Sequence, residues 1–147
     1  MAGGFYTSDV GQSLDRYELI DVLGTGAFAT VWRAHDPVID QEVAIKVLAD
    51  NWSRDVEVRQ RFLKEAKVAM EVTDRHLIRV HTVAESADTD TPYIVMALAD
   101  AGTLRERITA RRLSPHTTSE ALHIIRDVAT ATAALHDNGL LLSLIHI

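Results

Sequence analysis

The sequence predicts an α+β fold, in which a five-stranded antiparallel sheet with one intervening helix is followed by further helices. Short runs of strand-forming residues come in quick succession and are separated by turn residues, which favours antiparallel neighbours. Between the third run and the fourth, apolar residues recur every three or four positions, as in an amphipathic helix. The 147 residues of the chain suit one ordinary domain.

Three strands are expected near the start of the chain. Their sequences are YELIDVL (17–23), ATVWRAH (29–35) and EVAIKVL (42–48). The first two are joined by GTGAF, and a short glycine-containing link between two such runs indicates an antiparallel hairpin. Residues 1–15 are small and polar and include three glycines, so we expect a flexible tail there.

The first helix and two more strands are expected next. The helix should run from residue 55 to residue 70, where the apolar residues Val58, Phe62, Ala66 and Ala69 recur at helical spacing. The strand candidates that follow are HLIRVHTVAES (76–86) and PYIVMAL (92–98). The polar sequence SADTDT between them predicts a turn.

Two further helices are expected towards the end of the chain. The segment TLRE (103–106) has the form of a capping box, in which a Thr hydroxyl and a Glu carboxylate satisfy each other's backbone amides. A longer helix should open at Ser-Pro (114–115) and run to about His136, because proline suits a first helical turn. The following Asn-Gly (138–139) supplies a left-handed stop.

Composition limits the classes of function. The formal net charge of −6 gives no support for a nucleic-acid or anionic-membrane partner. The absence of cysteine excludes disulfides and thiolate metal sites. No segment approaches the ~20 apolar residues of a membrane helix, and the first residues lack the pattern of a secretory signal. We therefore expect a cytoplasmic chain that makes no membrane contact.

The segment LGTGAFATV contains Gly24, Gly26 and Ala29, which fit the pattern G-x-G-x-x-G/A. Glycine in such a loop lets backbone amides approach phosphate oxygens. A dinucleotide-binding loop would open a helix and be followed, about 20 positions on, by an acidic residue. Here poor helix formers follow, and Ala44 and Lys46 stand at that distance, which disfavours that class. A plain hairpin turn remains the alternative for the loop taken alone.

A cation and a carboxylate accompany the glycine loop. In an alternating strand, Ala44 and Lys46 face the same side, which is the side that a nucleotide under the hairpin would occupy. Glu65 lies beside the apolar stripe of the first helix, and Lys46 is its expected partner. The alternatives are a solvated lysine and a surface pair of Glu65 with Arg61, worth roughly a few tenths of a kcal/mol. Each alternative is the commoner outcome singly, but the three features together favour a phosphate site.

Taken together, these residues resemble a eukaryotic-type (Hanks-type) protein kinase, and the bacterial serine/threonine kinases in particular. The motifs are LGTGAFATVW, VAIKVL, RFLKEAKVAM, DRHLIRVHTV, PYIVMALADAGTL and ATAALHDNG, all in family order. The resemblance implies a kinase N-terminal lobe and hinge over residues 16–100. It implies the start of a helical C-terminal lobe over residues 101–141.

The resemblance also implies an ATP site. The glycine loop, formed by Gly24, Thr25, Gly26, Ala27, Phe28 and Ala29, would fold over the phosphates. Lys46 would hold the α- and β-phosphates, and Glu65 would fix that lysine, so these two are the expected catalytic residues. The adenine ring would lie among Leu23, Val31 and Ala44. Met96 would be the gatekeeper, and Ala97 and Ala99 would offer hinge backbone to the adenine edge.

The implied activity is transfer of the ATP γ-phosphate to serine or threonine hydroxyls of protein substrates. The choice of serine/threonine rests on the resemblance alone. The H-R-D-x-x-x-x-N and D-F-G motifs are absent, so Mg²⁺ ligands are expected outside this chain, which should be inactive alone. The alternatives are a pseudokinase or ATP-binding scaffold, and a small-molecule kinase. A longer parent could form a homodimer or carry a membrane anchor.

The last six residues, LSLIHI (142–147), depart from the resemblance. The codons CTG-TCT-CTT-ATA-CAC-ATC encode this peptide, and they are the transposase end sequence used to fragment DNA for sequencing. We therefore hypothesise that a kinase reading frame runs into sequencing adaptor after Leu141. A buried strand is the alternative.

Overall fold

The computed structural model describes residues 11–110 and 118–140 of the chain. These residues fall into two compact units. The first unit holds the residues up to Glu71 together with Arg79–Leu98, and the second holds Val72–Ile78 and the residues from Ala99 onward. The predicted adaptor-derived segment 142–147 and the expected helix start at 114–115 lie outside the described residues.

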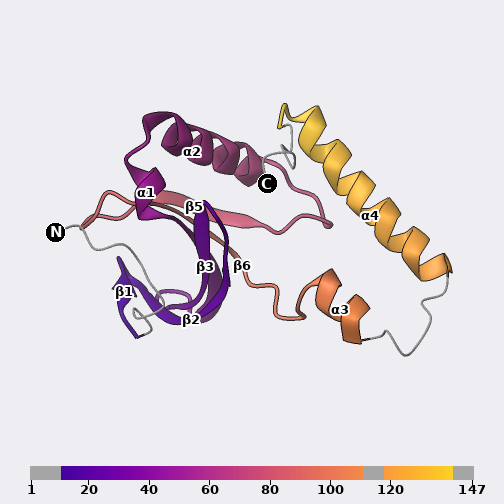
Figure 1. Cartoon of the computed structure of the whole chain (residues 1–147), viewed down its shortest axis with the longest axis horizontal. Coiled ribbons are helices and arrows are strands. Elements are labelled where there is room, and N and C mark those ends of the chain that lie inside the picture. Colours follow the sequence, from indigo (N-terminus) through magenta and orange to yellow (C-terminus); the bar gives the residue numbers. More distant parts are fainter. Residues whose placement is uncertain (1–10, 111–117, 141–147) are drawn as a thin grey trace. The chain divides into compact units, whose positions relative to one another are not determined.

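The first unit is built on a curled, six-stranded antiparallel sheet (Figure 1). Its strand order is β1-β2-β3-β4-β6-β5, so the last strand in sequence is inserted between β4 and β5. The strands are β1 (Ser13–Leu14), β2 (Tyr17–Thr25), β3 (Ala29–Asp36), β4 (Gln41–Leu48), β5 (Val80–Glu85) and β6 (Pro92–Ala97). Five of them lie where the sequence predicts strands.

The sixth strand corrects the prediction of five strands and of a flexible tail through residue 15. Leu14 in β1 is fully buried, and β1 pairs with the start of β2. The carboxylate of Asp15 accepts a hydrogen bond of 2.6 Å from the Tyr93 hydroxyl and one of 3.0 Å from the Ala87 N–H. These partners lie more than 70 residues away in the sequence. A polar, glycine-containing segment gave no local sign of them.

One face of the sheet carries the hydrophobic core. Alternate residues of β4, namely Val43, Ile45 and Val47, point into it, together with Trp32 from β3 and Val95 from β6. All five side chains are almost completely buried. The intervening residues of the same strands therefore belong to the opposite face, where the candidate site lies.

Two helices follow β4. Helix α1 (Asp50–Ser53) is a single turn that the sequence analysis does not predict, because four residues are too few to show a period. Helix α2 (Val56–Glu71) matches the predicted amphipathic helix, and Ala66 of its apolar stripe is buried. The carboxylate of Asp55 accepts the backbone N–H groups of Glu57 and Val58 and so caps this helix.

The second unit contains helices α3 (Leu104–Ala110) and α4 (Thr118–Asp137). The predicted capping box is present, since Thr103 Oγ1 accepts the Glu106 N–H and the Glu106 carboxylate accepts the Thr103 N–H at 2.7 Å. The predicted left-handed stop is also present, at Gly139 with a φ of 76°. In the described part of the chain, no helix is long and apolar enough to cross a membrane.

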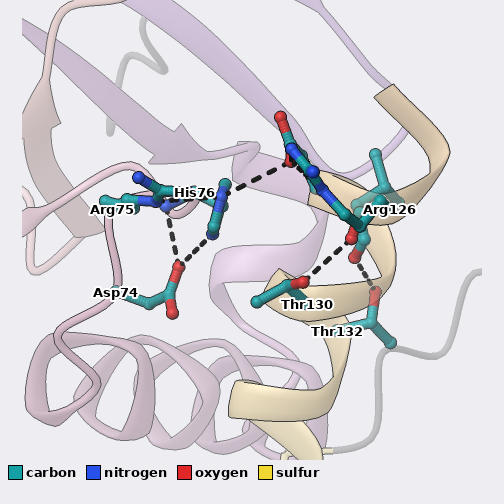
Figure 2. A network of polar contacts seen from close by, with 8 residues as sticks. Asp74, Arg75, His76, Arg126, Thr130 and Thr132 are labelled. Carbon is teal, nitrogen blue, oxygen red and sulfur yellow. Dashed lines mark hydrogen bonds and ion pairs between the residues drawn. The ribbon is translucent and has the colours of Figure 1, made fainter. Parts of the chain in front are cut away.

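A polar network ties the loop 72–78 to helix α4 within the second unit (Figure 2). The His76 ring lies 2.9 Å from the Asp74 carboxylate and 3.6 Å from that of Asp127 on α4. The N–H of His76 also bonds to Asp74 and holds the pKa of that carboxyl below its ordinary value. His76 is therefore a bridge between two carboxylates from different segments.

Candidate functional site

The glycine-containing hairpin joins β2 to β3 and is open to solvent. Residues 24–28 are exposed, and the hairpin closes through a 2.9 Å hydrogen bond from the Gly26 N–H to the Ala29 carbonyl. Neither Gly24 nor Gly26 has a positive φ, so the backbone conformation does not require glycine at either position. A Cβ on Gly24 would meet nothing within 4 Å. What glycine provides here is an uncovered backbone, which is compatible with a phosphate loop and with a plain turn.

Four of the predicted site residues share the face of the sheet opposite the core. Across the strands, Val31 is paired with Gly24 on one side and with Lys46 on the other. In β4, Ala44 faces the same way as Lys46 and is paired with Met96 of β6. The structure thus brings Val31, Ala44, Lys46 and Met96 together beside the glycine hairpin, from three separate sequence motifs.

The predicted ion pair between Lys46 and Glu65 is not formed. The Glu65 carboxylate instead accepts a 2.8 Å hydrogen bond from Arg61, which is the surface pair held open as the alternative. The Lys46 ammonium lies 5.8 Å from the centroid of the Phe62 ring and forms no ion pair with a residue that the structure describes. Arg61 precedes Glu65 by one helical turn, so this pairing needs no long-range contact.

The other predicted site residues differ in exposure and in backbone hydrogen bonding. Leu23 is about half exposed, and Ala29 is buried at the start of β3. The backbone N–H of Ala97 donates to the Arg79 carbonyl at 2.9 Å, so this amide is used within the sheet. Ala99 is exposed and belongs to the second unit.

A contact that the sequence analysis misses reaches the tip of the glycine hairpin. The indole N–H of Trp52 in α1 donates to the Ala27 carbonyl at 3.0 Å, and its ring lies 4.9 Å from the ring of Phe28. The only local signal was a tryptophan in a short polar stretch after β4, which predicts no particular partner.

Among the residues that the structure describes, no group of three or more His, Asp or Glu side chains could hold a metal ion. The site as described therefore offers a cation, an uncovered hairpin backbone and an apolar patch. This combination suits an anionic ligand with a planar apolar part, such as a nucleotide.

Comparison with known proteins identifies the family. The family model for protein tyrosine and serine/threonine kinases matches residues 17–146. The serine/threonine-protein kinase PrkC of Bacillus subtilis is 36% identical over 84% of this chain, and the probable serine/threonine-protein kinase PknB of Corynebacterium glutamicum is 35% identical over 86%. The chain covers only 18% and 20% of these two relatives, respectively.

The fold comparison agrees with the sequence comparison. The crystal structure of the Mycobacterium tuberculosis PknI kinase domain superposes with a TM-score of 0.76 at 27% identity, over 93% of this chain and 53% of that one. The glycine hairpin, the strand lysine and the amphipathic helix thus belong to a fold of the kinase type. The predicted resemblance is confirmed, and the chain belongs to the family of protein tyrosine and serine/threonine kinases.

Proposed function

We propose that this chain is the ATP-binding part of a protein kinase that phosphorylates serine or threonine on protein substrates. The observation that carries the proposal is the row across the sheet, in which Gly24, Val31 and Lys46 stand side by side under an exposed hairpin. The bacterial relatives are named serine/threonine-protein kinases, which supports that choice of substrate hydroxyl.

Different residues of this face would bind different parts of the nucleotide. The exposed hairpin 24–28 would offer backbone N–H groups to phosphate oxygens, apart from the Gly26 N–H, which already bonds to the Ala29 carbonyl. The Lys46 ammonium would neutralise the phosphate charge. Leu23, Val31 and Ala44 would cover the apolar faces of the adenine ring, and Met96 would be the gatekeeper behind it. The described residues offer no ligand set for Mg²⁺, and their proposed role is to bind and orient ATP.

Glu65 is proposed to exchange Arg61 for Lys46 as its partner in the active arrangement. Phe62 lies one helical turn before Glu65, on the same side of α2, and its ring is already near the Lys46 ammonium. The Arg61–Glu65 pair is exposed on both sides, so little free energy opposes the exchange.

The experiment compares Lys46→Met with Lys64→Met, which removes an exposed lysine from α2. Loss of a charge-assisted contact with phosphate should weaken ATP binding roughly 10- to 100-fold in the first variant and leave the second unchanged. Binding is measured by calorimetry on the 147-residue chain. Equal affinities of the two variants would contradict the proposed site.

Phosphoryl transfer needs its own measurement, because binding alone also fits the pseudokinase alternative. The full-length gene product is incubated with radiolabelled ATP and a protein substrate, and phosphoserine and phosphothreonine are separated after hydrolysis. Transfer that disappears with Lys46→Met supports the kinase assignment. ATP binding with no transfer would support the pseudokinase instead.

A further inference from the structure

The tip of the glycine hairpin is fastened to the segment that follows β4. Three contacts hold it, and they involve the two residues at the tip, Ala27 and Phe28. The Trp52 indole N–H donates to the Ala27 carbonyl at 3.0 Å. The rings of Phe28 and Trp52 lie 4.9 Å apart at a tilt of 39°. The Ala49 N–H donates to the Phe28 carbonyl at 2.9 Å.

The segment that makes these contacts is itself anchored. The short helix α1 is closed by hydrogen bonds from Trp52 and Ser53 backbone N–H groups to the Ala49 carbonyl. The guanidinium of Arg59 on α2 reaches the Ser53 carbonyl at 3.4 Å and pairs with the Glu85 carboxylate of β5 at 2.8 Å. The hairpin tip is thus linked through α1 to the helix and the far strand of the same unit.

If nothing held its tip, ordering this hairpin on ligand binding would cost conformational entropy. Two exposed glycines give its backbone a large conformational freedom, and a ligand that uses its amides must remove that freedom on binding. Contacts that already fix the tip reduce this entropic cost and raise the affinity. The benefit falls on the part of a ligand that the tip touches, which in the proposed site is the phosphate chain.

We propose that Trp52 is a positioning residue that holds the glycine hairpin in place for the phosphates of the nucleotide. This inference rests on the proposed ATP site. It makes Trp52 important for ligands that carry phosphates and unimportant for a nucleoside, because a nucleoside does not reach the hairpin tip. A purely structural role would instead affect every ligand of the site alike.

The experiment measures the affinities of ATP and adenosine for the 147-residue chain and three variants by calorimetry. Trp52→Leu removes the hydrogen bond and the ring contact, and should weaken ATP binding by about five- to tenfold. Trp52→Phe keeps one aromatic ring and loses the indole hydrogen bond, and should weaken ATP binding by about threefold. Adenosine affinity should stay within about twofold in both. Asn51→Ala, on the exposed side of the same helix, is the control and should change neither.

The outcomes separate this inference from the function on which it rests. If the unmodified chain binds neither ATP nor adenosine, the proposed site is wrong and the positioning role falls with it. If the unmodified chain binds both ligands, but Trp52→Leu lowers the two affinities equally or not at all, only the positioning role is overturned. Trp52→Phe remains measurable should the leucine variant unfold, because it keeps an aromatic ring beside Phe28.

Discussion

If Glu65 exchanges partners as proposed, Arg61 competes with Lys46 for its carboxylate, and removing Arg61 should strengthen nucleotide binding. Glu65 accepts a 2.8 Å hydrogen bond from Arg61 in the structure, whereas the proposed active arrangement needs it beside Lys46. Replacement of Arg61 by alanine leaves the carboxylate free to move. Replacement by glutamate adds a repulsion that drives it away from the surface position.

The magnitude follows from the exposure and the geometry of the pair. The two side chains are 56% and 47% exposed, and the pair joins residues four apart on one helix. Such pairs are worth roughly 0.2–0.5 kcal/mol, and less when the basic residue precedes the acidic one, as Arg61 does here. Arg61→Ala should therefore raise ATP affinity by up to about twofold, and Arg61→Glu by roughly two- to fivefold, because repulsion of similar size replaces the attraction.

The assay is ATP affinity by calorimetry for the unmodified chain and for the variants, with Lys67→Ala as a control that removes an exposed basic residue from the same helix. We expect Arg61→Glu to have the highest ATP affinity and Arg61→Ala the next highest. The unmodified chain and the control should have the same, lower affinity. A fall in ATP affinity with Arg61→Ala would refute the reasoning. It would mean that Arg61 supports the site in place of competing with it.

Two further predictions concern stability. Burial, together with the bond to Asp15, raises the pKa of the Tyr93 hydroxyl above its ordinary value of 10.0. The contribution of the protonated Tyr93 hydroxyl to folding stability is therefore complete below about pH 10 and is lost as the pH rises further. Tyr93→Phe should lower the free energy of unfolding in urea by roughly 1.5–3 kcal/mol at pH 7. The free energy of unfolding should also fall less steeply at alkaline pH in this variant. An equally steep fall in both proteins would exclude Tyr93 as its cause. Thr103→Ala should remove the capping bond and cost α3 about 1 kcal/mol, seen as faster amide exchange in that helix with unchanged exchange in the sheet. Unchanged exchange in α3 would contradict the capping role.

Features that depend on neighbouring residues were predictable from the sequence. The five main strands and α2 follow from alternation or helical period, and the cap of α3 follows from four residues of local chemistry. The shared face of Ala44 and Lys46 could also be foreseen, because side chains alternate along a strand.

Features that depend on distant contacts were not predictable. Strand β1 is only two residues long, and the adjoining Asp15 bonds to Tyr93 and Ala87, more than 70 residues away. The contact of Trp52 with the hairpin tip joins residues 25 positions apart, through a helix too brief to have a period. In both cases the sequence supplies the groups that interact, but only the folded sheet determines which of them meet.

The partner of Glu65 belongs to a third kind of feature, in which the sequence names both candidates and small energies choose between them. Arg61 is one turn away on the same exposed helix surface, and Lys46 is on a neighbouring strand. An exposed pair of this type is worth well under about 1 kcal/mol, which is less than a single charge-assisted contact between Lys46 and a phosphate could supply. A site whose resting arrangement is set by so small a difference can be rearranged by its own ligand. Glu65 is thus placed where nucleotide binding, rather than the fold, would decide which partner it takes.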